Sequence, residues 1–158
     1  MKIIDSIRKE AIFASLESEN KTGVLKELAE PVAGIAGMNR DEMVKDLLAR
    51  ENLGSTGIGG GVGIPHCKRK DMDSMSLGFG LSKKGVNFDS IDGKPVHIFF
   101  LLVTPENEAG LHLKILSRIS RLLKNEFFKE KLLKAKDRDE IYAIIKGEEE
   151  IILDGGED

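Results

Sequence analysis

The stretch VHIFFLLV, at residues 96–103, is apolar at every position except His97. Such a run is typical of a central β-strand covered on both faces, and that strand needs a helix layer on each side of its sheet. Residues 75–81 predict a second strand, because apolar side chains alternate there with small or polar ones. Both patterns favour the α/β class, as a single domain whose mixed central β-sheet is flanked by helices on both faces.

Segments on either side of these strands carry apolar residues at the spacing of amphipathic helices. In the first of them, Pro31 is expected to limit or kink the helix, because proline removes a backbone hydrogen bond. In the second, Asn39 and Glu42 have the spacing of a capping box. The predicted helices cover residues 22–36, 39–50 and 104–123, a segment around 128–133, and a segment that begins at 137.

The bulk composition limits both the class of protein and its partners. The 158 residues suit one compact domain, and a formal net charge of −3 argues against a nucleic-acid partner. The longest uninterrupted apolar run, residues 98–103, is far shorter than the roughly 20 residues that cross a bilayer. Charged residues at the N-terminus do not fit an export signal, so we expect a cytoplasmic protein.

The C-terminal end and the single cysteine give two further expectations. We place the domain at residues 1–147 and expect residues 148–158 to form an acidic, flexible tail. Cys67 is the only cysteine, so the chain forms no internal disulfide. The three histidines are too widely spread for a metal-ligand motif, and we expect neither a metal nor a cofactor.

Residues 54–63, GSTGIGGGVG, contain six glycines in ten positions and are expected to form a phosphate-sized loop. The common phosphate-binding motifs do not fit this loop. A P-loop would need a lysine where Gly60 stands, and no G-x-G-x-x-G pattern can be placed in any register. Ser55 is not a nucleophile-elbow serine, because Leu53 stands where that motif needs a glycine.

The order of polar residues around the loop suits phosphohistidine chemistry. Arg50 ends a predicted helix, His66 follows the loop, and His112 begins the long helix. An imidazole is largely neutral at cytoplasmic pH and can attack phosphorus without a separate base. An arginine fork adds charge-assisted hydrogen bonds to the phosphoryl oxygens.

Three segments together resemble the type-2 IIA (EIIA) domain of the bacterial phosphoenolpyruvate-dependent phosphotransferase system (PTS), the fructose, mannitol and nitrogen-regulatory branch. They are Arg50-Glu51 followed by GSTGIGGGVGIPH ending at His66, NFDSIDGKPVHIFFLLVTP at residues 87–105, and GLHLKILSRISRLL at residues 110–123. The resemblance covers roughly residues 20–145. Cys67 departs from it, since many members have glycine there.

The resemblance implies a role for each site residue. His66 would accept a phosphoryl group from the phosphocarrier protein HPr, His112 would support the phosphate, and Arg50 would stabilise its charge. The loop residues expected to bind the phosphoryl group are Ser55, Thr56 and Gly57.

The resemblance also implies partners. The acceptor would be a IIB domain with a reactive cysteine, for sugar uptake, or a regulated protein, and the membrane would be reached only through a permease. Within these 158 residues we expect no IIB or membrane domain, which leaves both roles open with a slight preference for regulation. We expect a phosphotransferase component with a phosphohistidine intermediate rather than a free-standing metabolic enzyme. A regulatory binding module that is not phosphorylated, and a small hydrolase using the same surface depression, remain alternatives.

Overall fold

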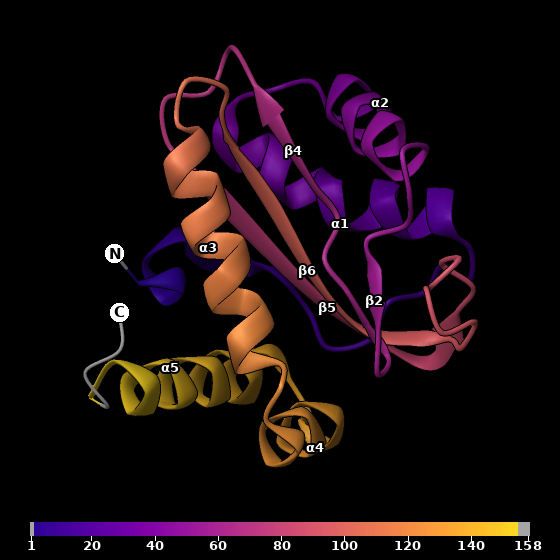
Figure 1. Cartoon of the computed structure of the whole chain (residues 1–158), viewed down its shortest axis with the longest axis vertical. Helices are drawn as coiled ribbons and strands as arrows, with labels where there is room; N and C mark the ends of the chain where they lie inside the picture. The colour runs from indigo at the N-terminus through magenta and orange to yellow at the C-terminus, as the bar shows by residue number, and fades with distance from the viewer. Residues whose placement is uncertain (1, 155–158) are drawn as a thin grey trace.

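The computed structural model describes residues 2–154 and contains a six-stranded mixed sheet with helices on both faces (Figure 1). This arrangement confirms the predicted fold class. The strands are β1 (Ile7–Phe13), β2 (Gly57–Gly59), β3 (Val62–Gly63), β4 (His66–Arg69), β5 (Ser76–Val86) and β6 (Val96–Pro105). The helices are the short 3-10 turn η1 (Ile3–Ser6), α1 (Lys21–Ala36), α2 (Arg40–Glu51), α3 (Ala109–Leu122), α4 (Glu126–Lys134) and α5 (Arg138–Asp154).

Strand β6 is the centre of the sheet, as its apolar sequence predicts. It pairs with β5 in an antiparallel ladder on one edge and, on the other edge, with β3 and then β4 in parallel. Ile98, Phe100 and Leu102 pack toward α3, α4 and α5, whereas Phe99 and Leu101 pack toward α1 and α2. The alternation of successive side chains therefore buries β6 in two separate cores.

Of the six strands, only β5 and β6 were predicted from the sequence. Strand β1 pairs with β5, but three exposed charged residues in its middle hide the apolar alternation. Strands β2 and β3 form a tight hairpin within residues 57–63, which the sequence predicted to be a loop. In the turn, Gly59, Gly60 and Gly61 all have positive φ angles, a backbone conformation that other residues adopt at a cost.

Helix α1 continues through Pro31, so the prediction that this proline limits or kinks the helix is wrong as regards its length. The helix runs on to Ala36 and ends at Gly37, which is left-handed and donates back to Ala33. Burial of Val32 and Ala33 beyond the proline favours continuation. Packing of the apolar face therefore outweighs the missing proline N–H.

The acidic C-terminal segment also differs from the expectation of a flexible tail. Helix α5 continues through Asp154, and residues 155–158 lie outside the described residues. Glu149 is fully buried and accepts hydrogen bonds from the backbone N–H groups of Ile3, at 2.5 Å, and Ile4, at 3.0 Å. Its carboxylate also lies 3.7 Å from the Arg118 guanidinium. Residues 148–154 are therefore part of the fold, because Glu149 satisfies backbone donors near the other end of the chain.

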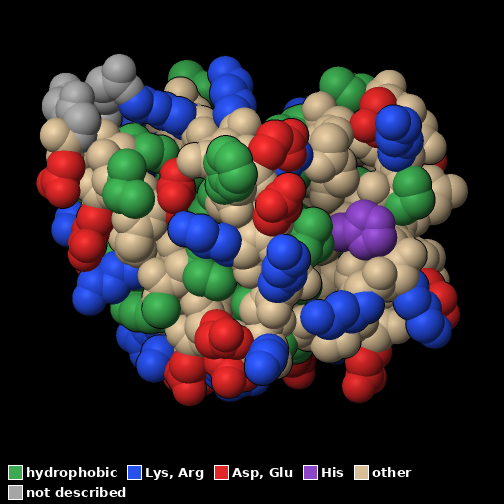
Figure 2. Space-filling view, turned by 90° about the horizontal axis from the view of Figure 1, so that it is seen from below, with side chains coloured by type: hydrophobic (Ala, Val, Ile, Leu, Met, Phe, Trp, Pro, Cys, Tyr) green, Lys and Arg blue, Asp and Glu red, His purple; other side chains and the backbone are tan. Residues whose placement is uncertain are grey.

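Charges on the surface are mixed. Lysine, arginine and acidic side chains are interspersed on the face shown in Figure 2. Of the described helices, none combines the length and the apolar character that crossing a membrane requires.

The buried Glu149 carboxylate predicts that the C-terminal helix α5 contributes to the stability of the fold. Glu149→Ala leaves two buried N–H groups without their acceptor and removes the carboxylate that lies 3.7 Å from the buried Arg118 guanidinium, so we expect it to lower the free energy of unfolding by about 3 kcal/mol. Urea denaturation followed by circular dichroism measures the loss. Glu150→Ala, at the exposed neighbouring position, is the matched control and should change stability little. Equal losses in both variants would mean that Glu149 is as dispensable as a surface acid.

Candidate functional site

His66 is the first residue of β4 and is held in place by the central strand. The Leu102 N–H of β6 donates to the Pro65 carbonyl at 3.0 Å, and His66 itself is in register with Leu102. The half-buried ring places Nδ1 2.7 Å from the Ile64 carbonyl oxygen. A carbonyl only accepts, so Nδ1 carries the hydrogen and, in the neutral ring, Nε2 carries the lone pair.

His112 lies in the first turn of α3 beside His66, with the two ring centroids 5.2 Å apart. The ring is buried, and its Nδ1 lies 2.6 Å from the hydroxyl oxygen of Thr104. Burial, followed by the positive charges that His66 and Lys68 can carry, lowers the pKa of His112 to about 4. His112 is therefore a neutral imidazole at neutral pH.

The charge state of His66 is set mainly by burial, which lowers its pKa below the ordinary value of 6.5. The hydrogen bond to Ile64 opposes this effect, and the charges of Arg50 and Lys68 add to it. Each of these positive charges favours the neutral ring. The lone pair on Nε2 is therefore available at cytoplasmic pH.

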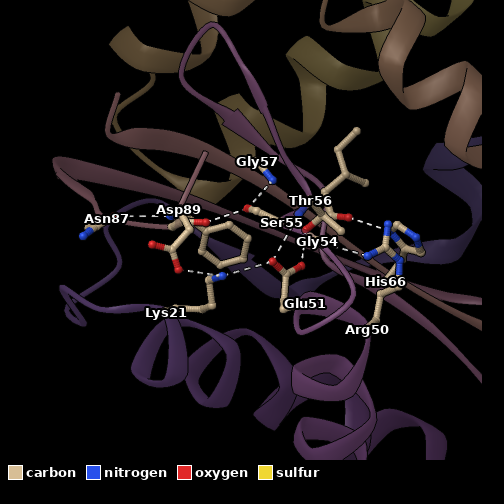
Figure 3. Close-up of polar contacts among 12 residues, drawn as sticks. Lys21, Arg50, Glu51, Gly54, Ser55, Thr56, Gly57, His66, Asn87 and Asp89 are labelled. Atoms are coloured by element: carbon tan, nitrogen blue, oxygen red, sulfur yellow. Dashed lines mark hydrogen bonds and ion pairs between the residues drawn. The ribbon is translucent and has the colours of Figure 1, made fainter. Parts of the chain in front are cut away.

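Arg50 stands in the last turn of α2, where its Nη1 donates to the Gly54 carbonyl at 2.8 Å. This bond uses one N–H group and leaves the rest of the guanidinium fork for other acceptors. Figure 3 draws the Arg50 and His66 side chains next to each other. The structure thus brings together the three residues that the sequence singled out for the chemistry.

These three residues line one open cavity of about 1100 Å³. Lys68, Arg69 and Lys70 border it together with Asp46, Asp71 and Glu106, and Arg69 is paired with both aspartates. Two leucines on the border are strongly exposed, Leu53 at 85% and Leu113 at 68%. The surface depression predicted around His66 is present.

The structure places Ser55, Thr56 and Gly57 outside the border of this cavity, and their phosphate-binding role stays a prediction. Figure 3 shows that their polar groups bind elsewhere. The Ser55 hydroxyl donates to the Phe88 carbonyl at 2.6 Å and accepts from the Gly57 N–H at 3.0 Å. The Thr56 hydroxyl and N–H both donate to the buried Glu51 carboxylate. These contacts fix the path of the chain between α2 and β2.

The glycines are likewise used in the hairpin turn, and none of residues 54–63 is among those that border the cavity. The Gly60 N–H donates to Asp92 and its carbonyl accepts from Lys129, both at 3.1 Å. The glycine content therefore reports a tight, clamped turn.

Sequence reasoning missed two residues at the site. Lys68 follows His66 by two positions, so strand alternation places both on one side of β4. That signal was present, but residues 66–69 were not recognised as a strand. Thr104 reaches His112 only because β6 and α3 pack together, and no local pattern reveals such a contact.

Cys67 borders the cavity, but its thiol is not activated. Burial is the main cause that raises the pKa of the Cys67 thiol to about 12, so the thiol is protonated at neutral pH and is a poor nucleophile. Within residues 2–154, no group of three or more His, Cys, Asp or Glu side chains is arranged to hold a metal ion.

Comparison with known proteins identifies the family of this chain. The sequence profile of the family described as "Phosphoenolpyruvate-dependent sugar phosphotransferase system, EIIA 2" matches residues 5–148. The chain belongs to this family. This membership confirms the resemblance drawn from the sequence.

Three relatives show which proteins this EIIA domain is similar to. A nitrogen regulatory protein of Bradyrhizobium diazoefficiens is 38% identical over 145 residues, which cover 92% of this chain and 95% of the relative. A PTS fructose-specific EIIABC component of Bacillus subtilis is 37% identical over 92% of this chain but only 23% of its own length. The crystal structure of the nitrogen regulatory protein IIA-Ntr from Neisseria meningitidis has a TM-score of 0.86 at 31% identity and covers 90% of this chain and 98% of that one.

The lowered pKa of His112 generates a prediction about stability in this EIIA domain. Between pH 6.5 and about 4 the unfolded state binds a proton on this ring that the folded state does not, so acidification destabilises the fold. We expect His112→Asn to lose less stability than wild type between pH 6.5 and 4.5, by on the order of 2 kcal/mol. Urea denaturation at several pH values measures both slopes.

His97→Asn removes a half-buried imidazole that hydrogen bonds to the Ser82 carbonyl outside the cavity, and it serves as the control. A His112→Asn slope identical to that of wild type would contradict the assignment of a neutral His112.

Proposed function

We propose that this EIIA domain is a phosphocarrier that accepts a phosphoryl group from HPr on Nε2 of His66. The observation that carries the proposal is the hydrogen bond from Nδ1 to the Ile64 carbonyl, which leaves Nε2 unprotonated in an open cavity. The neighbouring His112 ring supports it, with its centroid 5.2 Å from that of His66. Family membership supports phosphoryl transfer as the reaction class.

In the proposed transfer, the Nε2 lone pair of His66 forms a bond to phosphorus while the bond from phosphorus to the donor imidazole breaks. The donor ring leaves with that electron pair. The His66 ring gains positive charge as it becomes phosphorylated, and the Ile64 carbonyl, which accepts from Nδ1–H, stabilises this charge. No other base is needed, because the attacking nitrogen carries no hydrogen.

Arg50 and His112 compensate the charge of the phosphoryl oxygens. Arg50 retains free N–H groups after its bond to Gly54, and its position on the last turn of α2 is fixed by that bond. His112 contributes as a neutral donor, so it does not repel the developing positive charge on His66. The phosphoryl group would thus lie between one cation and two imidazoles.

The shape and border of the cavity support a protein as the donor. Leu53 and Leu113 are mostly exposed on its border, and a partner protein that docks there would bury them. An open cavity also admits a donor histidine that projects from a second protein surface. HPr is the donor that the family implies, and we place the reaction in the cytoplasm, with membrane contact only through a permease.

Two destinations for the phosphoryl group follow from the relatives. In one, the phosphorylation state controls partner proteins, and this role is favoured because the Bradyrhizobium and Neisseria nitrogen regulatory proteins match over nearly their whole lengths. In the other, a IIB cysteine receives the group for sugar uptake, which the fructose-specific Bacillus relative supports. Transfer of labelled phosphate to a purified IIB domain distinguishes the two.

The proposal predicts that His66 is the sole acceptor. Incubation with phosphoenolpyruvate, enzyme I and HPr should add one acid-labile phosphoryl group to the wild type and none to His66→Ala. Intact-mass spectrometry before and after acid treatment measures the change.

His97→Ala is the matched control and should be phosphorylated like wild type, since His97 lies outside the cavity. Acid-labile phosphate on His66→Ala would contradict the assignment of His66 as the phosphoryl acceptor. A wild type that takes no phosphate would favour a regulatory binding module that works without phosphorylation. Metal-dependent turnover of a small substrate would favour a hydrolase.

The proposal predicts different roles for Arg50 and Ser55. We expect Arg50→Ala to slow single-turnover phosphorylation by about 100-fold, because one charged donor to the phosphoryl oxygens is lost. Ser55→Ala should leave the rate close to wild type, since its hydroxyl is bound to Phe88 and Gly57. Rapid-quench kinetics with phosphorylated HPr measures both rates. A larger loss in Ser55→Ala than in Arg50→Ala would return the phosphate-binding role to the glycine-rich segment.

A further inference from the structure

Thr104 lies near the end of β6, directly behind His112. Its side chain is fully buried, and its hydroxyl oxygen is 2.6 Å from Nδ1 of the imidazole. The chain between them turns from β6 into α3, where the His112 N–H donates to the Glu108 carbonyl at 3.0 Å. The central strand thus holds the ring through Thr104, and the first turn of α3 holds the backbone of His112.

The position of one hydrogen on this ring decides what His112 can do. Burial keeps the ring neutral at cytoplasmic pH, and a neutral imidazole has one N–H and one lone pair. If the hydrogen is on Nδ1, the other nitrogen repels a phosphoryl oxygen. If it is on Nε2, that nitrogen donates to the oxygen.

The hydrogen bond to Thr104 distinguishes these two tautomers. Throughout residues 2–154, the hydrogen-bond partner of this hydroxyl is Nδ1 of His112. A hydroxyl that accepted from Nδ1–H would leave its own hydrogen without an acceptor in a fully buried place, which is unfavourable. The hydroxyl therefore donates, and Nδ1 accepts.

This tautomer is the complement of the one at His66. There the Ile64 carbonyl holds the hydrogen on Nδ1 and leaves a lone pair on Nε2. At His112 the Nδ1 side is turned to β6, so the Nε2 side is the one that remains for the cavity that the ring borders. One ring is set to attack phosphorus and the other to donate to its oxygens.

We propose that Thr104 is a positioning residue whose hydroxyl donates to Nδ1 of His112 and so keeps the ring hydrogen on Nε2, toward the phosphoryl site. The tautomer follows from the contacts of the two buried side chains. Its effect on phosphoryl transfer rests on the proposed function of His66.

Two substitutions separate the hydroxyl from the shape of the side chain. Thr104→Val keeps the volume and removes the donor, whereas Thr104→Ser keeps the donor and removes a methyl group. Long-range ¹H–¹⁵N correlation spectra of the ring nitrogens report the tautomer of His112 directly. We expect the Nε2–H form in wild type and in Thr104→Ser, and a substantial fraction of the Nδ1–H form in Thr104→Val.

The same variants are compared in single-turnover phosphorylation by phosphorylated HPr. We expect Thr104→Val to lower the maximal rate roughly tenfold or more, with the HPr concentration for half-maximal rate unchanged, because only the support of the phosphoryl oxygens is weakened. Thr104→Ser should recover most of the rate. Thr22→Val, at an exposed threonine of α1, is the control and should resemble wild type.

The spectra and the kinetics distinguish a failure of the proposal for Thr104 from a failure of the proposed function of His66. An Nδ1–H tautomer in wild type, or a Thr104→Val protein with both tautomer and rate unchanged, overturns the proposal for Thr104. A wild type that accepts no phosphate overturns the proposed function of His66, while the spectra still decide the tautomer. If Thr104→Val does not fold, the wild-type spectrum and the Thr104→Ser rate decide the matter.

Discussion

The backbone pairing of β6 is the constraint on which the rest of the structure depends. This buried strand has to satisfy its N–H and C=O groups on both edges, and β5 does so on one edge while β3 and β4 share the other. The break between β3 and β4 falls at Ile64-Pro65, so His66 emerges where pairing resumes. Thr104, at the end of the same strand, holds His112. Both imidazoles are therefore positioned by one rigid element.

The electrostatic consequence is that the imidazole rings of His66 and His112 are neutral beside positively charged side chains. Partial burial disfavours the protonated imidazoles, and the charges of Arg50 and Lys68 act in the same direction on His66. A phosphoryl group would add negative charge beside Arg50 and Lys68. The negative charge of the buried Glu51 raises the pKa of His66, but burial is the main cause and the net direction is toward the neutral ring.

The sequence predicted what depends on local pattern and missed what depends on packing. Residues 96–103 identified the central strand because burial on both faces leaves an unbroken apolar run. His66 and His112 were predicted to meet because the family resemblance supplied a contact that spacing alone does not. Strand β1 was missed because its exposed charges obscure the alternation. The glycines of residues 54–63 were assigned to phosphate because composition shows that a backbone is permissive but not where its N–H groups point.

The hydrogen bonds between Glu149 and the first turn of the chain join residues 146 positions apart. During synthesis, η1 and β1 leave the ribosome long before α5 has been made, and β1 must also wait for β5. The sheet can assemble around β6 while the amino-terminal N–H groups are still bound to water. Closure of the fold is then a late event that waits for the last helix. Premature termination within α5 would therefore yield a chain with strand β6 paired but without the hydrogen bonds between Glu149 and η1.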